Sequence, residues 1–147
     1  YSIYNSPTKD SIYDIVELAV YINTYMKMLS KILTQRKIPN ISVGIGIATS
    51  QELIIKAGRK NSGINSKVWI GKAVTGASNL SSVGNKNDIG PIVMSRITYD
   101  NVINRFLKVN QNAKSWFNNG KTASLGEFFH CNLVNSGFDA WISNGMS

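Results

Sequence analysis

The sequence is poor in the residues that build disulfides and zinc sites. It holds one cysteine, Cys131, and one histidine, His130, among 147 residues. A single cysteine excludes an internal disulfide, and the lack of a Cys/His cluster argues against zinc. His130 lies in an apolar stretch and is interpreted as a packed structural residue. We therefore expect a reducing, cytoplasmic location.

Long apolar runs are missing as well. No run approaches the roughly 18 residues that suggest a membrane span, and no signal-peptide pattern is found. The sequence does not begin with methionine: residues 1–4 read Tyr-Ser-Ile-Tyr, which is typical of the tail of a strand. We expect one domain over residues 1–147, with one or more N-terminal strands upstream of it.

Acidic residues are half as numerous as basic ones, 8 against 16, so the net charge is +8. Such a balance suits a polyanion or a phosphate-rich small molecule. The basic residues are scattered, and the only adjacent pairs are Arg36-Lys37 and Arg59-Lys60. This scatter favours an ordinary solvated surface. A nucleic-acid-binding domain would rest on charge alone, and we expect no such partner.

Residues 8–37 carry the clearest periodic pattern in the sequence. Apolar residues recur at alternating spacings of three and four, which predicts one face of a long helix. Asp10 and Asp14 near its start are interpreted as favourable charges at a helix N-terminus, and Pro39 ends it. The apolar face comprises Ile12, Ile15, Ala19, Ile22, Met26, Leu29 and Leu33.

Residues 41–48 alternate in a way that predicts a strand. Gly44 and Gly46 occupy its other face, so another element is expected to pack very close to it. The remaining pattern gives helices and strands in alternation, which predicts an α+β sandwich with helices covering a mixed sheet. The other expected elements are an apolar piece at 53–55, a polar loop at 58–66, strands at 68–70, 92–94 and 128–134, helices at 73–82 and 99–108, a loop over 109–125 and a closing segment at 138–142.

The turn after residues 68–70 is the most distinctive local feature. Gly71 permits a tight passage from strand to helix, and the small residues 76–78 let that helix lie close to the sheet. Lys72 stands beside the helix N-terminus, where backbone N–H groups and the helix dipole favour an anion. The sequence therefore predicts a phosphate site at this turn.

These segments resemble the class III adenylate/guanylate cyclase domain. Residues 44–50 are similar to its strand Gly-Ile-Gly-Ile-His-Thr-Gly, and residues 69–80 to its strand-turn-helix Trp-Gly-Asn, Thr-Val-Asn-x-Ala-x-Arg-Leu. Residues 4–7, 54–58, 62–65 and 68–72 look like the Pycsar branch, bacterial enzymes that make cyclic CMP or cyclic UMP. The resemblance spans nearly the whole chain, in the family's order.

The resemblance implies a ferredoxin-like cyclase fold, with a mixed, mostly antiparallel sheet covered by helices, and a head-to-tail homodimer with active sites at its interface. In the family, two aspartates hold two divalent ions, Mn²⁺ or Mg²⁺. Both aspartates are expected upstream of Tyr1, so no metal ligand is assigned here. Asp10 and Asp14 match neither position.

Four positions carry over from the family's site. The helix Asn falls on Thr75 and the helix Arg on Asn79, which are the catalytic candidates, although neither keeps the family's residue. Lys72 is a candidate to replace the lost cation at the substrate. Val68 falls where adenylate cyclases use Asp to read adenine, which disfavours ATP and suits a pyrimidine.

Two functions therefore stand open. The first is a cyclase that converts CTP or UTP to the 3′,5′-cyclic monophosphate and pyrophosphate, a second messenger in antiphage defence. The second is a cyclase-homology domain that has lost catalysis and serves as a nucleotide-binding or regulatory dimerisation module.

Overall fold

The computed structural model describes residues 2–50, 53–58 and 65–146; over 53–58 and 65–70 it describes the backbone alone. The helices are α1 (Lys9–Gln35), α2 (Lys72–Val83), α3 (Arg96–Val109) and α4 (Ser136–Ser143), with one 3₁₀ turn η1 (Ala113–Trp116). The strands are β1 (Ile45–Ile47), β2 (Leu53–Gly58), β3 (Asn65–Ile70), β4 (Ile92–Ser95), β5 (Asn118–Thr122) and β6 (Gly126–Cys131).

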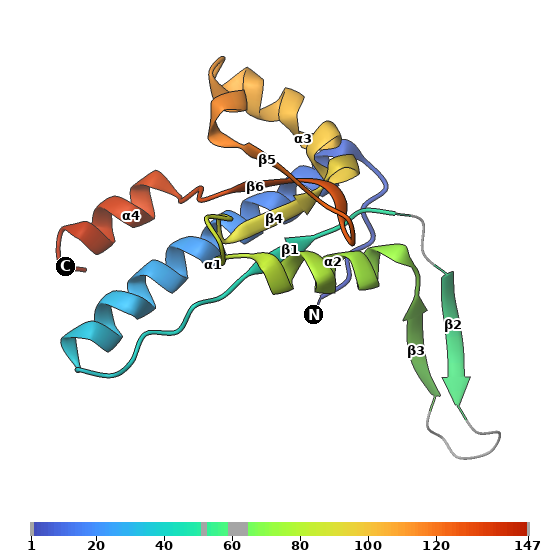
Figure 1. Ribbon diagram of the computed structural model, residues 1–147, viewed down its shortest axis with the longest axis horizontal. Coiled ribbons are helices and arrows are strands. Elements are labelled where there is room, and N and C mark those ends of the chain that lie inside the picture. The colour runs from blue at the N-terminus through green and yellow to red at the C-terminus, as the bar shows by residue number, and fades with distance from the viewer. Residues whose placement is uncertain (1, 51–52, 59–64, 147) are drawn as a thin grey trace.

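Four strands form a mixed sheet in the order β1-β4-β6-β5. β1 runs parallel to β4, with Gly46 opposite Val93, whereas the β4–β6 and β5–β6 pairs are antiparallel. β2 and β3 form a separate antiparallel pair that projects beyond the start of α2 (Figure 1). The predicted α+β class, with a mixed and mostly antiparallel sheet covered by helices, is confirmed.

Helices cover both faces of the four-stranded sheet (Figure 1). On one face α1 and α3 enclose the larger core, in which Ile92 and Met94 of β4 are fully buried. On the other face α2 buries Leu80 against Val93 and Phe128. Successive residues of β4 thus point to opposite cores, as the pleat of a strand requires.

The two strand glycines explain how α2 reaches the sheet. A Cβ atom at Gly46 would lie under 3.0 Å from the backbone of Ala77 and of Ser81, and one at Gly44 would meet the backbone of Ser81 and Gly84. Only residues without a side chain leave room for this approach. The expected close packing on the glycine face is confirmed, and the partner is α2.

The long helix predicted over residues 8–37 is confirmed as α1. The Thr8 side chain caps it by accepting a hydrogen bond from the Ser11 amide, as hydroxyl residues do at helix starts. The predicted apolar face is only partly inside, however. Ile12 and Ala19 are buried, whereas Ile22 is 40% exposed.

Several predicted boundaries were wrong, and pairing with a neighbouring strand explains two of them. Residues 41–48 form a strand only over 45–47, where β4 lies beside them. The expected loop at 109–125 contains η1 and β5, because residues 118–122 pair with β6. Residues 2–7 form no strand, the final strand ends at Cys131, and residues 138–142 belong to α4. The part of the polar loop at residues 59–64 lies outside the described residues.

Within the described ranges, no helix combines the length and the apolarity needed to cross a bilayer.

Candidate active site

The predicted site begins where β3 passes directly into α2. Gly71 is the N-cap of α2 and provides no side-chain hydrogen bond to the helix. Its φ of 172° and ψ of 177° are extended. Any residue can adopt this conformation, so the turn does not use the conformational freedom of glycine. The positive end of the helix dipole at the start of α2 favours an anionic ligand.

Three of the four predicted site residues share one face of α2. Lys72, Thr75 and Asn79 are all exposed, and their spacing of three and four aligns them along the helix. Leu80, on the opposite face, is buried against the sheet. With the residues that the structure describes, the three side chains form no hydrogen bond or ion pair.

Sequence reasoning missed that this polar face continues along α2. Ser78 and Ser82 are exposed as well, and the Ser82 hydroxyl donates to the Asn79 carbonyl oxygen at 2.6 Å. Their spacing from Thr75 was the signal that could have identified them. The face thus presents the Lys72 ammonium, the Thr75 and Ser78 hydroxyls and the Asn79 amide as hydrogen-bond donors suited to phosphate and ribose oxygens.

The fourth residue, Val68, lies on β3 opposite Ile55 of β2, three residues before the helix N-cap. Its side chain lies outside the described part of the structure. The backbone places the residue on the strand that leads into the donor face of α2, so the position assigned to base recognition is four residues before Lys72, the position assigned to phosphate binding.

The acidic residues of α1 have other surroundings than a metal cluster. Among the described residues, no three His, Cys, Asp or Glu side chains gather at one place. Asp10 lies in the first turn of α1, where its carboxylate pairs with Arg105 of α3 at 3.3 Å, and Asp14 is exposed on the same helix.

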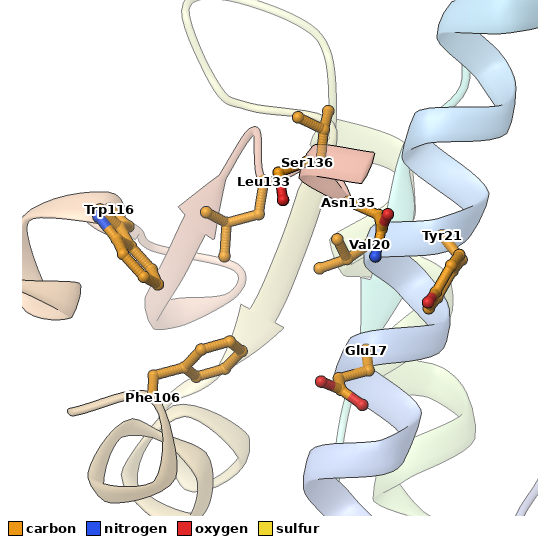
Figure 2. Close-up of a pocket in the computed structure, with 9 residues that line it drawn as sticks. Glu17, Val20, Tyr21, Phe106, Trp116, Leu133, Asn135 and Ser136 are labelled. Atoms are coloured by element: carbon orange, nitrogen blue, oxygen red, sulfur yellow. The ribbon is translucent and has the colours of Figure 1, made fainter. Parts of the chain in front are cut away.

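Two hollows in the described surface lie away from the α2 donor face. One, of about 220 Å³, opens between α1, η1 and the start of α4 (Figure 2). Phe106, Trp116 and Leu133 form its apolar wall. Asn135, which also lines it, caps α4: its side-chain oxygen accepts a hydrogen bond from the Phe138 amide at 2.9 Å.

The second hollow, of about 310 Å³, surrounds His130 of β6 near the loop after α2. His130 is 9% exposed, and its Nδ1 accepts a hydrogen bond from the Gly90 amide at 2.9 Å. Burial lowers the pKa of His130 below its usual value of about 6.5. The interpretation of His130 as a packed structural histidine is confirmed.

This histidine makes the stability of the fold depend on pH. A protonated Nδ1 cannot accept the Gly90 hydrogen bond, so the folded state favours neutral His130. Its stabilisation is fully present above about pH 6.5 and is lost as the pH falls through the lower pKa of the folded state. We expect urea denaturation to give a lower free energy of unfolding at pH 5.5 than at pH 7.5.

The control for that experiment is His130→Asn, which keeps a neutral acceptor. Asp88 also lines the hollow. Measuring the Asp88→Asn variant at the same two pH values separates any effect of Asp88 on the free energy of unfolding from that of His130. If the wild type and His130→Asn lose equal stability between the two pH values, His130 is not responsible.

The chain is similar to one curated protein of known activity. No family model matches it, and no solved structure matches it. It is 44% identical over 147 residues to a curated uridylate cyclase of Treponema porcinum. The aligned region covers 99% of this chain and 49% of that protein, so the chain spans about half the length of the curated relative. Nearly all of the chain is therefore similar to one half of a uridylate cyclase.

Proposed function

We propose that the full-length protein is a pyrimidine nucleotide cyclase, with UTP as the first candidate substrate and CTP as the second. The observation that carries the proposal is the 44% identity to a uridylate cyclase over 99% of the chain. Residues 44–50 and 69–80, which carry the cyclase resemblance, contribute the closely packed β1–α2 unit. The exposed donor face of α2 belongs to that unit.

In the proposed reaction the 3′-hydroxyl oxygen attacks the α-phosphorus of the same nucleotide. The bond from the α-phosphorus to the bridging oxygen breaks, pyrophosphate leaves, and the hydroxyl proton passes to solvent. Negative charge develops on the phosphate oxygens, so preorganised donors and cations lower the barrier. Lys72 supplies a positive charge at the start of α2, and Thr75 and Asn79 supply an oxygen and an amide donor one and two turns further on.

Base selection is assigned to the strand before this helix. A valine at position 68 has no acceptor for the amino group of adenine, which favours a pyrimidine over ATP. The proposal includes a homodimer in which a second copy faces α2, and two Mn²⁺ or Mg²⁺ ions held by residues outside these 147. It also includes a role for the product as a second messenger in antiphage defence.

The experiment is an assay of the full-length protein with CTP, UTP, ATP and GTP in the presence of Mn²⁺. We expect a cyclic pyrimidine monophosphate and an equal amount of pyrophosphate, with UTP or CTP converted faster than either purine. Because the family's Asn and Arg are replaced by Thr75 and Asn79 here, a lapsed regulatory domain is the competing function. Nucleotide binding without any cyclic product would establish that alternative and overturn the enzyme proposal.

A further inference from the structure

The hollow between α1, η1 and the start of α4 combines an aromatic wall with one carboxylate. Phe106 and Trp116 pack edge to face in this wall, with ring centroids 6.3 Å apart. Figure 2 shows them across the open space from Val20 and Glu17 of α1. The volume of about 220 Å³ is below the roughly 300–1,000 Å³ of pockets for drug-sized ligands. A ligand that fits this hollow is therefore small and has an apolar part.

Glu17 brings a negative charge to this hollow. Among the described residues that line it, Glu17 alone is charged. Glu17 lies one turn after Tyr13, whose hydroxyl donates a hydrogen bond to the Glu17 carboxylate. Because Tyr13 packs on Phe106 with ring centroids 4.8 Å apart, this hydrogen bond keeps the carboxylate on the side of α1 that faces the aromatic wall. A fixed negative charge thus lies at the edge of an apolar hollow.

The Glu17 carboxylate has no cationic partner within the described parts of the chain, although basic residues outnumber acidic ones by 16 to 8. Four other acids each pair with a lysine or an arginine, namely Asp10, Asp100, Glu127 and Asp139. Asp14 and Asp88 also lack such a partner in the described structure, but neither lines the aromatic hollow. The charge of Glu17 is therefore available to a ligand in the hollow.

We propose that this hollow binds a small organic cation with an apolar body, such as an arylalkyl ammonium or guanidinium ion. The body packs against Phe106, Trp116 and Leu133, and the cationic group lies at the Glu17 carboxylate. Burial of the apolar body drives binding, and a cation close to an aromatic face gains further electrostatic attraction. An anion would be repelled by Glu17. The site is separate from the α2 donor face, and this inference does not depend on cyclase activity.

A matched set of probes tests the proposal on the full-length protein: phenethylammonium, phenethyl alcohol and hydrocinnamate. The probes share a phenyl ring on a short linker and differ in charge. Binding is followed by heteronuclear NMR at the indole N–H groups of tryptophan. Trp116 lines the hollow, and Trp141, which is 42% exposed on α4, controls for contact with any accessible tryptophan. Trp116→Phe and Trp141→Phe assign the two signals.

We expect phenethylammonium to shift the Trp116 signal until it saturates and to leave the Trp141 signal nearly unchanged. Phenethyl alcohol should bind roughly fivefold more weakly, which is the upper end of what one partly exposed ion pair contributes, and hydrocinnamate more weakly still. Equal shifts at the two tryptophans, or no saturable shift at Trp116, would overturn the proposal. An affinity for the alcohol or the carboxylate equal to that for the ammonium would overturn it as well.

The variant Glu17→Gln removes the charge from an exposed side chain and keeps its size. We expect it to lower the affinity for phenethylammonium by roughly fivefold and to leave the affinity for phenethyl alcohol unchanged, which isolates the charge interaction. Asp14→Asn, at an exposed acid of the same helix that does not line the hollow, is the matched control and should bind the ammonium like the wild type. Equal affinities of Glu17→Gln and Asp14→Asn for the ammonium would contradict the role assigned to Glu17.

Discussion

Replacing Gly46 by alanine is expected to lower the free energy of unfolding by about 3 kcal/mol or more, at the upper end of the cost of overpacking a core. The added Cβ would lie under 3.0 Å from the carbonyl oxygen of Ala77 and the amide nitrogen of Ser81. Both are backbone atoms of α2, so no side-chain rotation relieves the contact. The helix would have to move away from β1, and the donor face of α2 would move with it.

Gly76→Ala in the same helix is the matched control. A Cβ there would meet the Ala48 Cβ at 3.4 Å, an ordinary contact. Alanine in a helix interior is favoured over glycine by about 1 kcal/mol, so this variant is expected to be slightly more stable than the wild type. Urea denaturation measures both. If Gly46→Ala unfolds at the same urea concentration as the wild type, α2 does not pack on β1 as described.

Replacing Asn79 by alanine is expected to lower kcat for cyclisation by roughly 100-fold, the size of effect seen when one donor to a developing charge is removed. The side chain is exposed and forms no hydrogen bond with described residues, so its loss should leave the free energy of unfolding nearly unchanged. A fall in kcat with little change in KM would indicate that the amide acts mainly in the transition state.

The control for Asn79 is Asn104→Ala, an exposed asparagine on α3 on the other face of the sheet. It matches the chemistry of the change and the helical setting, and its kcat should equal that of the wild type. If Asn79→Ala cyclises as fast as Asn104→Ala, the α2 face does not contact the reacting phosphate.

Local patterns were sufficient for much of this fold. The spacing of apolar residues located α1 to within a few residues, and Gly44 and Gly46 indicated a close neighbour. In both cases a short stretch of sequence contains the pattern that predicts the structure. The same holds for the shared face of Lys72, Thr75 and Asn79, because helical periodicity alone places residues three and four apart together.

The errors arose where a strand is defined by its pairing partner rather than by its own residue pattern. Residues 118–122, Asn-Asn-Gly-Lys-Thr, have no apolar alternation, yet they pair with β6. Gly120 is required there because a Cβ would strike the ring of buried Phe128, a contact that no local pattern contains. Trp141, on α4, is 42% exposed rather than part of a core. The roles assigned to Val68 and to the metal ions stay predictions.

The central claim is that the exposed face of α2 binds the phosphates and ribose of a pyrimidine nucleotide. A crystal structure of the full-length protein with a non-reactive UTP analogue tests it most directly. The account predicts phosphate or ribose oxygens within about 3.2 Å of the side-chain donors of Lys72, Thr75 or Asn79. A nucleotide bound elsewhere, for example in the hollow around His130, with the α2 face in contact only with solvent, would contradict it.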